Sequence, residues 1–244
     1  MAVPGATDDA ELQQFSGTAT GVTLPKTILF DLDGTLVDTA PDLAGAMNHV
    51  LAGLGRPTLP VDMVRHLVGH GARALISRGL EVTGEARPDL VEPSMPLFLD
   101  HYAAHIADAS RPFDGVEPAL DALAAAGCRL AICTNKPTGL ANRLVAALGW
   151  QGRFAAVIGH DMAPKAKPDA SHVMVTLAAC GGEAGDAAFV GDSATDAGAA
   201  RNAGLPLVLV RFGYTDVPAD TLGADALIDH YDELVPALAG LPRA

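Results

Sequence analysis

The sequence predicts the α/β class: a core built on a doubly wound parallel sheet, with an inserted helical cap domain. From residue 113 onward, short apolar runs alternate with helix-length segments, which is typical of a parallel sheet with right-handed crossovers. One more apolar run, residues 28–30, lies far ahead of the others. The block of about seventy residues between them is far too long for one crossover connection.

These observations predict how the chain divides into domains. We expect residues 25–38 and 112–244 to form the core domain and residues 39–111 to form an inserted α-helical cap, with the hinge near Asp38 and Arg111. Residues 1–24 are rich in Gly, Thr, Ala and Asp and lack the basic start and apolar centre of a secretory signal. We interpret them as a disordered leader.

Composition excludes some classes of partner. The chain has 244 residues, 49% of them hydrophobic, which is enough for a sizeable core. Its net charge of −13 argues against nucleic acid or an anionic membrane, because both require a basic face. No stretch is long and apolar enough to span a membrane. Cys128, Cys133 and Cys180 cannot all pair within one chain, which favours the reducing cytoplasm. The oligomeric state stays open.

The first strand is the centre of the predicted Rossmann-like core. Ile28, Leu29 and Phe30 form an apolar run typical of a strand buried on both faces. Asp31 and Asp33 follow it directly, at the strand end where open α/β sheets bind ligands.

The remaining elements follow from periodicity and from Gly and Pro positions. The cap is expected to hold helices and no strand, with helices at residues 41–54, 60–68, 72–80 and 96–107. In the core, strands are expected at residues 129–133, 156–158, 187–190, 207–210 and 226–228. Helices are expected between them at residues 116–126, 138–148, 169–180 and 194–203, with a last one from residue 231.

Polar residues follow two of the later strands. Thr134 and Asn135 come after the second strand, where they either bind phosphoryl oxygens or cap the next helix. Lys167 stands just before a helix start, where the helix dipole disfavours a positive charge. It is either a functional cation or a solvated lysine.

A second pair of carboxylates follows the fourth strand. Asp192 or Ser193 could be only an N-cap of the next helix, but Asp196 would then gain nothing from its position. Because parallel strands end at one edge of the sheet, these acids should lie near Asp31 and Asp33. Four clustered carboxylates require a hard cation, and oxygen ligands suit Mg²⁺.

In these motifs the chain resembles the haloacid dehalogenase superfamily of phosphatases. Residues 31–35, 134–135, 167–168 and 191–196 match its four motifs in order, and the resemblance covers the chain from about residue 26 to its end. Within that superfamily it is most similar to phosphoglycolate phosphatases, through residues 33–43 and 67–75.

The resemblance implies Mg²⁺-dependent hydrolysis of a small phosphate monoester, 2-phosphoglycolate, through an aspartyl-phosphate. It implies that Asp31 is the nucleophile and Asp33 the general acid and base. Mg²⁺ would be held by the Asp31 carboxylate, the Asp33 carbonyl and Asp192, with Asp196 orienting the metal's waters. It also implies that Lys167, Thr134 and Asn135 hold the phosphoryl group.

Some alternatives stay open. Arg73, in the first turn of a helix that follows Gly69-His70-Gly71, either pairs with a substrate carboxylate or is solvated. The enzyme could instead be a phosphatase or mutase for another small sugar phosphate. A phospho-Asp signalling domain is a more distant alternative, since it would have no cap and no acid at position 33.

Overall fold

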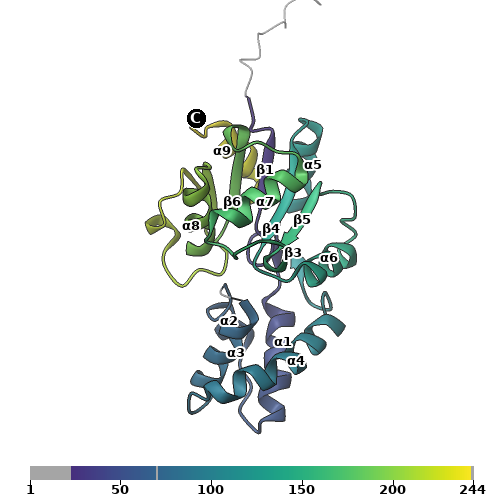
Figure 1. Ribbon diagram of the computed structural model, residues 1–244, viewed down its shortest axis with the longest axis vertical. Coiled ribbons are helices and arrows are strands. Elements are labelled where there is room, and N and C mark those ends of the chain that lie inside the picture. Colours follow the sequence, from purple (N-terminus) through teal and green to yellow (C-terminus); the bar gives the residue numbers. More distant parts are fainter. Residues whose placement is uncertain (1–22, 70, 243–244) are drawn as a thin grey trace, which may run out of the picture.

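The computed structural model describes residues 23–69 and 71–242, so the expected leader lies almost wholly outside the described residues. Figure 1 shows a layered α/β part above a separate group of four helices, α1 to α4. The predicted fold class is confirmed by this architecture. None of the described helices is long and apolar enough to cross a membrane.

The large sheet has six parallel strands in the order β5-β4-β1-β6-β7-β8. Their bounds are β1 Thr27–Phe30, β4 Arg129–Thr134, β5 Ala156–Gly159, β6 Ala187–Gly191, β7 Leu207–Val210 and β8 Ala226–Ile228. β1 is central, with β4 on one side and β6 on the other. The residues that follow β1 therefore lie at the switch point of the sheet, where such folds bind ligands.

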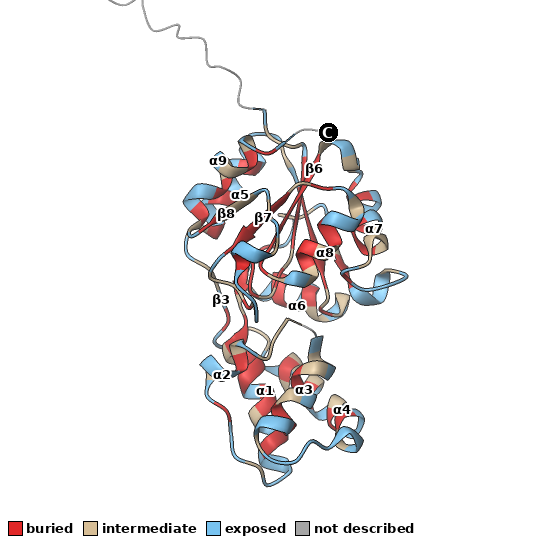
Figure 2. Ribbon diagram, turned by 90° about the vertical axis from the view of Figure 1, so that its left-hand side faces the viewer, coloured by how far each residue is buried: buried red, intermediate tan, exposed pale blue. Residues whose placement is uncertain are grey.

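Helices cover both faces of this sheet. α5 (Val116–Ala125), α6 (Thr138–Ala147) and α9 (Leu234–Ala239) pack on one face, and α7 (Ala170–Cys180) and α8 (Ala194–Ala203) on the other. Successive side chains of β1 alternate between the two cores, as a strand requires: Ile28 and Phe30 join one cluster, and Leu29 joins the other. Figure 2 shows the buried strands between these helices. The helix expected from Tyr231 begins as a 3₁₀ turn, Tyr231–Glu233, before α9.

The four lower helices are α1 (Ala40–Gly53), α2 (Val61–Arg65), α3 (Gly71–Val82) and α4 (Pro88–Ala104). The predicted start of the last one, at residue 96, is wrong, because α4 runs through Pro93 and Pro96. Its buried residues Val91, Phe98 and Tyr102 pack in one cluster with α1 and α3. Packing of one face thus stabilises a helix that proline would otherwise interrupt.

The chain passes between the sheet and the four helices twice, and the two passing segments pair as short antiparallel strands. These are β2 (Val37–Asp38), before α1, and β3 (Arg111–Pro112), after α4. No strand was predicted there, because two residues are too few to show a pattern. Asp42 strengthens the same place by accepting hydrogen bonds from the backbone of Ala109 and from Ser110. The division into core and cap at residues 38/39 and 111/112 stays a prediction, and this paired segment lies at that boundary.

Candidate active site

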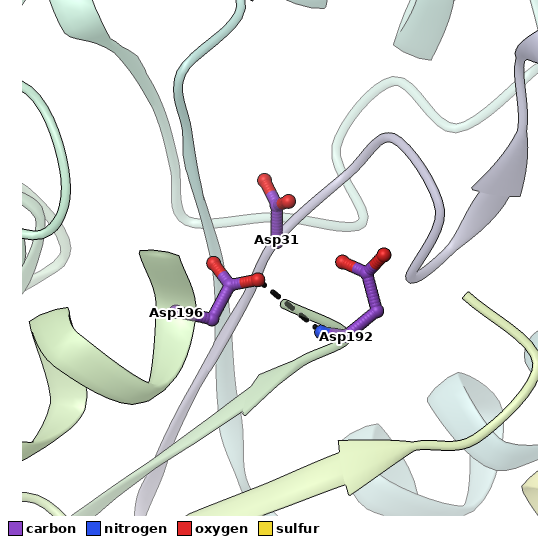
Figure 3. A group of neighbouring side chains, drawn as sticks. All are labelled: Asp31, Asp192 and Asp196. Carbon is purple, nitrogen blue, oxygen red and sulfur yellow. Dashed lines mark hydrogen bonds between the residues drawn. The ribbon is translucent and has the colours of Figure 1, made fainter. Parts of the chain in front are cut away.

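Three carboxylates meet where β1 and β6 end. Asp31 follows β1 and Asp192 follows β6, and the pairing of Phe30 with Val190 brings these two strand ends level. Asp196 lies in the first turn of α8. Figure 3 shows the three side chains grouped together, and one oxygen of each lies within 4.8 Å of those of the other two.

Asp196 has a structural role as well as a place in this group. It forms a capping box with Ser193, in which its Oδ2 accepts hydrogen bonds from the Ser193 hydroxyl at 2.6 Å and the Ser193 N–H at 3.1 Å. The expectation that Asp196 gains nothing from capping is therefore wrong. Burial acts to raise the pKa of Asp196, but Lys167 and these hydrogen bonds outweigh it and lower the pKa.

Lys167 is a buried cation between two of the acids. Its Nζ lies 2.6 Å from Asp196 Oδ1 and 2.9 Å from Asp31 Oδ1. Burial acts to lower the pKa of Lys167, but the two carboxylates outweigh it and raise the pKa above its ordinary value. The alternative of a solvated lysine is thus excluded by its position.

Asp192 is held from both sides. Its Oδ1 accepts a hydrogen bond from the Thr35 hydroxyl at 3.0 Å, and its Oδ2 accepts one from the Tyr214 N–H at 2.6 Å. Gly34, with φ of 85°, leaves room for it, because a Cβ there would lie 2.6 Å from Asp192 Oδ2. The backbone turn after β1 is therefore shaped around this carboxylate.

One lysine does not balance the negative charge of the three carboxylates. Burial, followed by Asp196 and Asp31, raises the pKa of Asp192 well above its ordinary value. Burial likewise raises the pKa of Asp31 to about 6, although Lys167 opposes the shift. Buried carboxylates that resist ionisation are relieved by a hard cation, and three oxygen donors this close together suit one. The group therefore fits a divalent metal.

The side chains predicted to follow β4 also lie at this edge. The Asn135 side chain donates to the Lys167 carbonyl and accepts from the Lys167 N–H, both at 3.0 Å. Thr134 is buried, and its hydroxyl accepts from the Lys136 N–H at 3.2 Å. Neither caps α6, whose N-cap is Pro137 without a side-chain bond. Asn135 instead holds the backbone that carries the buried lysine.

Asp33 has a partner that the sequence analysis did not single out. Lys136 Nζ lies 2.8 Å from Asp33 Oδ1 and 2.6 Å from the Tyr102 hydroxyl of α4. Burial acts to lower the pKa of Lys136, but Asp33 and Tyr102 outweigh it and raise the pKa. Its position in the sequence could have identified Lys136, because it lies two residues after Thr134, at the same strand end.

Arg73 is not brought together with these residues. Its side chain, on α3, is 65% exposed and forms an ion pair with Glu92 of α4. An exposed pair of this kind contributes little to stability. A role for Arg73 at the substrate stays a prediction.

Comparisons with known proteins agree with this geometry. A family model described as haloacid dehalogenase-like hydrolase matches residues 25–204. The chain is 52% identical over 210 residues to a phosphoglycolate phosphatase of Caulobacter vibrioides, a match that covers 84% of this chain and 87% of that protein. It is 44% identical to a phosphoglycolate phosphatase of Agrobacterium fabrum, over 86% of this chain and 91% of that one.

The fold is also similar to solved structures. A predicted phosphoglycolate phosphatase from Haemophilus somnus 129PT superimposes with a TM-score of 0.82 at 31% identity, covering 88% of this chain and 99% of that one. The family match spans β1, the acidic group and both lysines. The chain therefore belongs to the haloacid dehalogenase-like hydrolases.

Proposed function

We propose that this protein hydrolyses 2-phosphoglycolate to glycolate and phosphate, with Mg²⁺ and through an aspartyl-phosphate intermediate. The observation that carries the proposal is Asp31, a carboxylate at the sheet's switch point with Lys167 Nζ 2.9 Å away and Asp192 and Asp196 beside it. Its relatives named phosphoglycolate phosphatases support the choice of substrate.

In the first step, an Asp31 oxygen attacks phosphorus and the bond from phosphorus to the glycolate oxygen breaks. Asp33 donates a proton to that leaving oxygen. In the second step, Asp33 takes a proton from water, whose oxygen attacks phosphorus and releases phosphate and Asp31. Two successive displacements at phosphorus return the enzyme to its starting state.

The surrounding residues stabilise charge. Lys167 neutralises charge on the transferring phosphoryl group, and Asp196 and Asn135 hold the lysine in place. Thr134 is the last residue of β4, and its hydroxyl would bind a phosphoryl oxygen. Mg²⁺, held by the Asp31 and Asp192 carboxylates and the Asp33 carbonyl, would supply further positive charge there.

The setting of the reaction is part of the proposal. Three free cysteines, Cys128, Cys133 and Cys180, support a reducing compartment, and we place the enzyme in the cytoplasm. Its partner is then a small anionic metabolite, consistent with a net charge of −13, which disfavours nucleic acid and anionic membranes.

The test is a comparison of substrates. Phosphate release from 2-phosphoglycolate and from hexose and pentose phosphates is measured with Mg²⁺, while the sugar phosphates are also assayed for isomerised products. We expect kcat/KM to be highest for 2-phosphoglycolate and no isomerised product to form. Faster hydrolysis of a sugar phosphate would contradict the substrate, and an isomerised product would favour a mutase.

A further inference from the structure

Lys136 is a buried lysine that joins the sheet to the helical part. It lies two residues beyond β4, and its Nζ hydrogen-bonds to Asp33 Oδ1 and to the Tyr102 hydroxyl, with the ammonium 4.4 Å from the centre of the Tyr102 ring. An ammonium has three N–H donors, so Lys136 can accommodate one more acceptor. The proton of the Tyr102 hydroxyl is likewise still able to donate, because this oxygen accepts from Lys136.

Lys136 and Tyr102 are among the residues that line a small cavity between α3, α4 and the loop after β4. Its volume is about 60 Å³, and most of its other lining is apolar, including Leu43, Leu75 and Leu140. A water requires about 10 to 15 Å³ of such volume, so the cavity has room for a few non-hydrogen atoms. A two-carbon acid fits that size, whereas a pentose or hexose does not.

The chemistry of 2-phosphoglycolate places its carboxylate close to the leaving oxygen. One methylene separates the two groups, so with bonds of about 1.2 to 1.5 Å the carboxylate oxygens lie about 3 Å from the leaving oxygen. In the proposed mechanism that oxygen takes its proton from Asp33. The carboxylate must therefore lie within a few ångströms of Asp33, where Lys136 Nζ is placed 2.8 Å from Asp33 Oδ1.

We propose that Lys136, together with the Tyr102 hydroxyl, binds the carboxylate of the substrate and selects short phosphorylated 2-hydroxy acids. This inference rests on the proposed function, since it uses Asp33 as the acid that protonates the leaving group. Arg73, the cation expected for this task, is exposed and pairs with Glu92, whereas Lys136 is buried beside Asp33. A buried ammonium also favours a substrate with a carboxylate over one without it more strongly than an exposed guanidinium does, because charges interact more strongly away from water.

The test uses ethyl phosphate, which matches the length of 2-phosphoglycolate but has no carboxylate. The readout is the ratio of kcat/KM for 2-phosphoglycolate to that for ethyl phosphate, so that any effect of Lys136 on Asp33 itself cancels. We expect Lys136→Met to lower this ratio by about 10- to 100-fold, as the loss of one charged hydrogen bond does. Tyr102→Phe, which keeps the ring, is expected to lower the ratio by about 3- to 10-fold.

A matched control is Lys165→Met, because Lys165 is an exposed lysine paired with Asp169 and should leave the ratio unchanged. Binding is measured separately by calorimetry in an Asp31→Asn background, where the substrate is not turned over. In that background, Lys136→Met should weaken the binding of 2-phosphoglycolate by a similar factor and should change the binding of ethyl phosphate little.

An unchanged ratio in Lys136→Met would overturn the inference and leave Lys136 as a partner of Asp33 only. A fall confined to Arg73→Ala would overturn it in favour of Arg73. If the wild-type protein itself hydrolysed both esters equally well, the proposed substrate would fail together with the inference. These results distinguish failure of the carboxylate contact from failure of the function.

Discussion

Tyr214 donates its backbone N–H to Asp192 Oδ2 at 2.6 Å. The hydroxyl of the same tyrosine donates to Asp38 Oδ1 at 2.5 Å and accepts from the Ala40 N–H at 2.8 Å. Asp38 also pairs with Arg65 of α2. One residue therefore connects a proposed metal ligand with the strand and the first helix that lead out of the sheet.

This connection predicts the effect of Tyr214→Phe. The variant leaves a buried Ala40 N–H without its acceptor and removes a donor from Asp38, so the free energy of unfolding should fall by about 1 to 3 kcal/mol. Urea unfolding measures the change. Tyr231→Phe is the control, because it removes a single hydrogen bond, the one to the Thr35 carbonyl, and should cost less than Tyr214→Phe, which removes two. Equal losses would contradict a special role for Tyr214.

Asp31→Asn should abolish hydrolysis while the fold stays intact. An amide cannot form the phosphoenzyme, so kcat should fall by at least about a thousandfold. Rates are measured on protein freed of contaminating phosphatases, with thermal melting as the check on folding. Substantial turnover by well-folded Asp31→Asn would rule out Asp31 as the nucleophile.

Lys167→Met should damage both activity and stability. It leaves Asp31 and the buried Asp196 without the lysine that pairs with both, and removing one partner of a buried ion pair costs about 3 to 5 kcal/mol. Lys165→Met removes a lysine whose side chain is 75% exposed and should change stability by about 0.5 kcal/mol or less. Denaturant unfolding of the two variants gives the comparison. Similar stabilities would show that Lys167 is not essential to the buried group.

Mg²⁺ should stabilise the folded protein in proportion to its binding. A ligand that binds only the folded state raises the free energy of unfolding by about 2.7 kcal/mol at a hundred times its Kd. Thermal melting with added Mg²⁺, and after chelation, measures this effect. Asp192→Asn should lose the Mg²⁺-dependent part, since it removes one of the three grouped carboxylates. Full Mg²⁺ stabilisation in that variant would place the metal elsewhere.

The buried His172 should make stability depend on pH, separately from any effect of the acidic group. Its imidazole is buried on α7, its Nε2 lies 3.1 Å from the Ile158 carbonyl, and burial lowers its pKa to about 4. Because the unfolded chain takes up a proton near pH 6.5 and the folded chain only near pH 4, stability is lost as pH falls through that window. The loss approaches about 3 kcal/mol.

His172→Gln, whose amide can still donate to the Ile158 carbonyl, should flatten this dependence. His66→Gln is the control, because His66 is exposed. The free energy of unfolding is measured by urea titration from pH 7 to pH 4. An unchanged slope in His172→Gln would show that another group titrates in this window.

The sequence by itself determined the sheet and the acidic edge. The apolar run of β1 requires burial on both faces, and regular alternation of strands and helices predicts a parallel sheet. In such a sheet all strands end at one edge, so the residues after β1, β4 and β6 had to gather there. The predicted grouping of Asp31, Asp192 and Asp196 is present in the structure. The order of strands and acidic residues along the chain was sufficient to predict this grouping, because a parallel sheet brings the residues that follow its strands to one edge.

Contacts between the helical part and the sheet were decided only by the tertiary structure. Tyr102 lies 34 positions from Lys136 along the chain, and Tyr214 lies 176 from Asp38, so no local pattern links either pair. The pairing of Arg73 with Glu92 depends in the same way on how α3 packs against α4. A hydrophobic pattern specifies which face of a helix is buried, but the side chains that meet across two packed elements depend on their relative placement. That placement is a property of the whole fold.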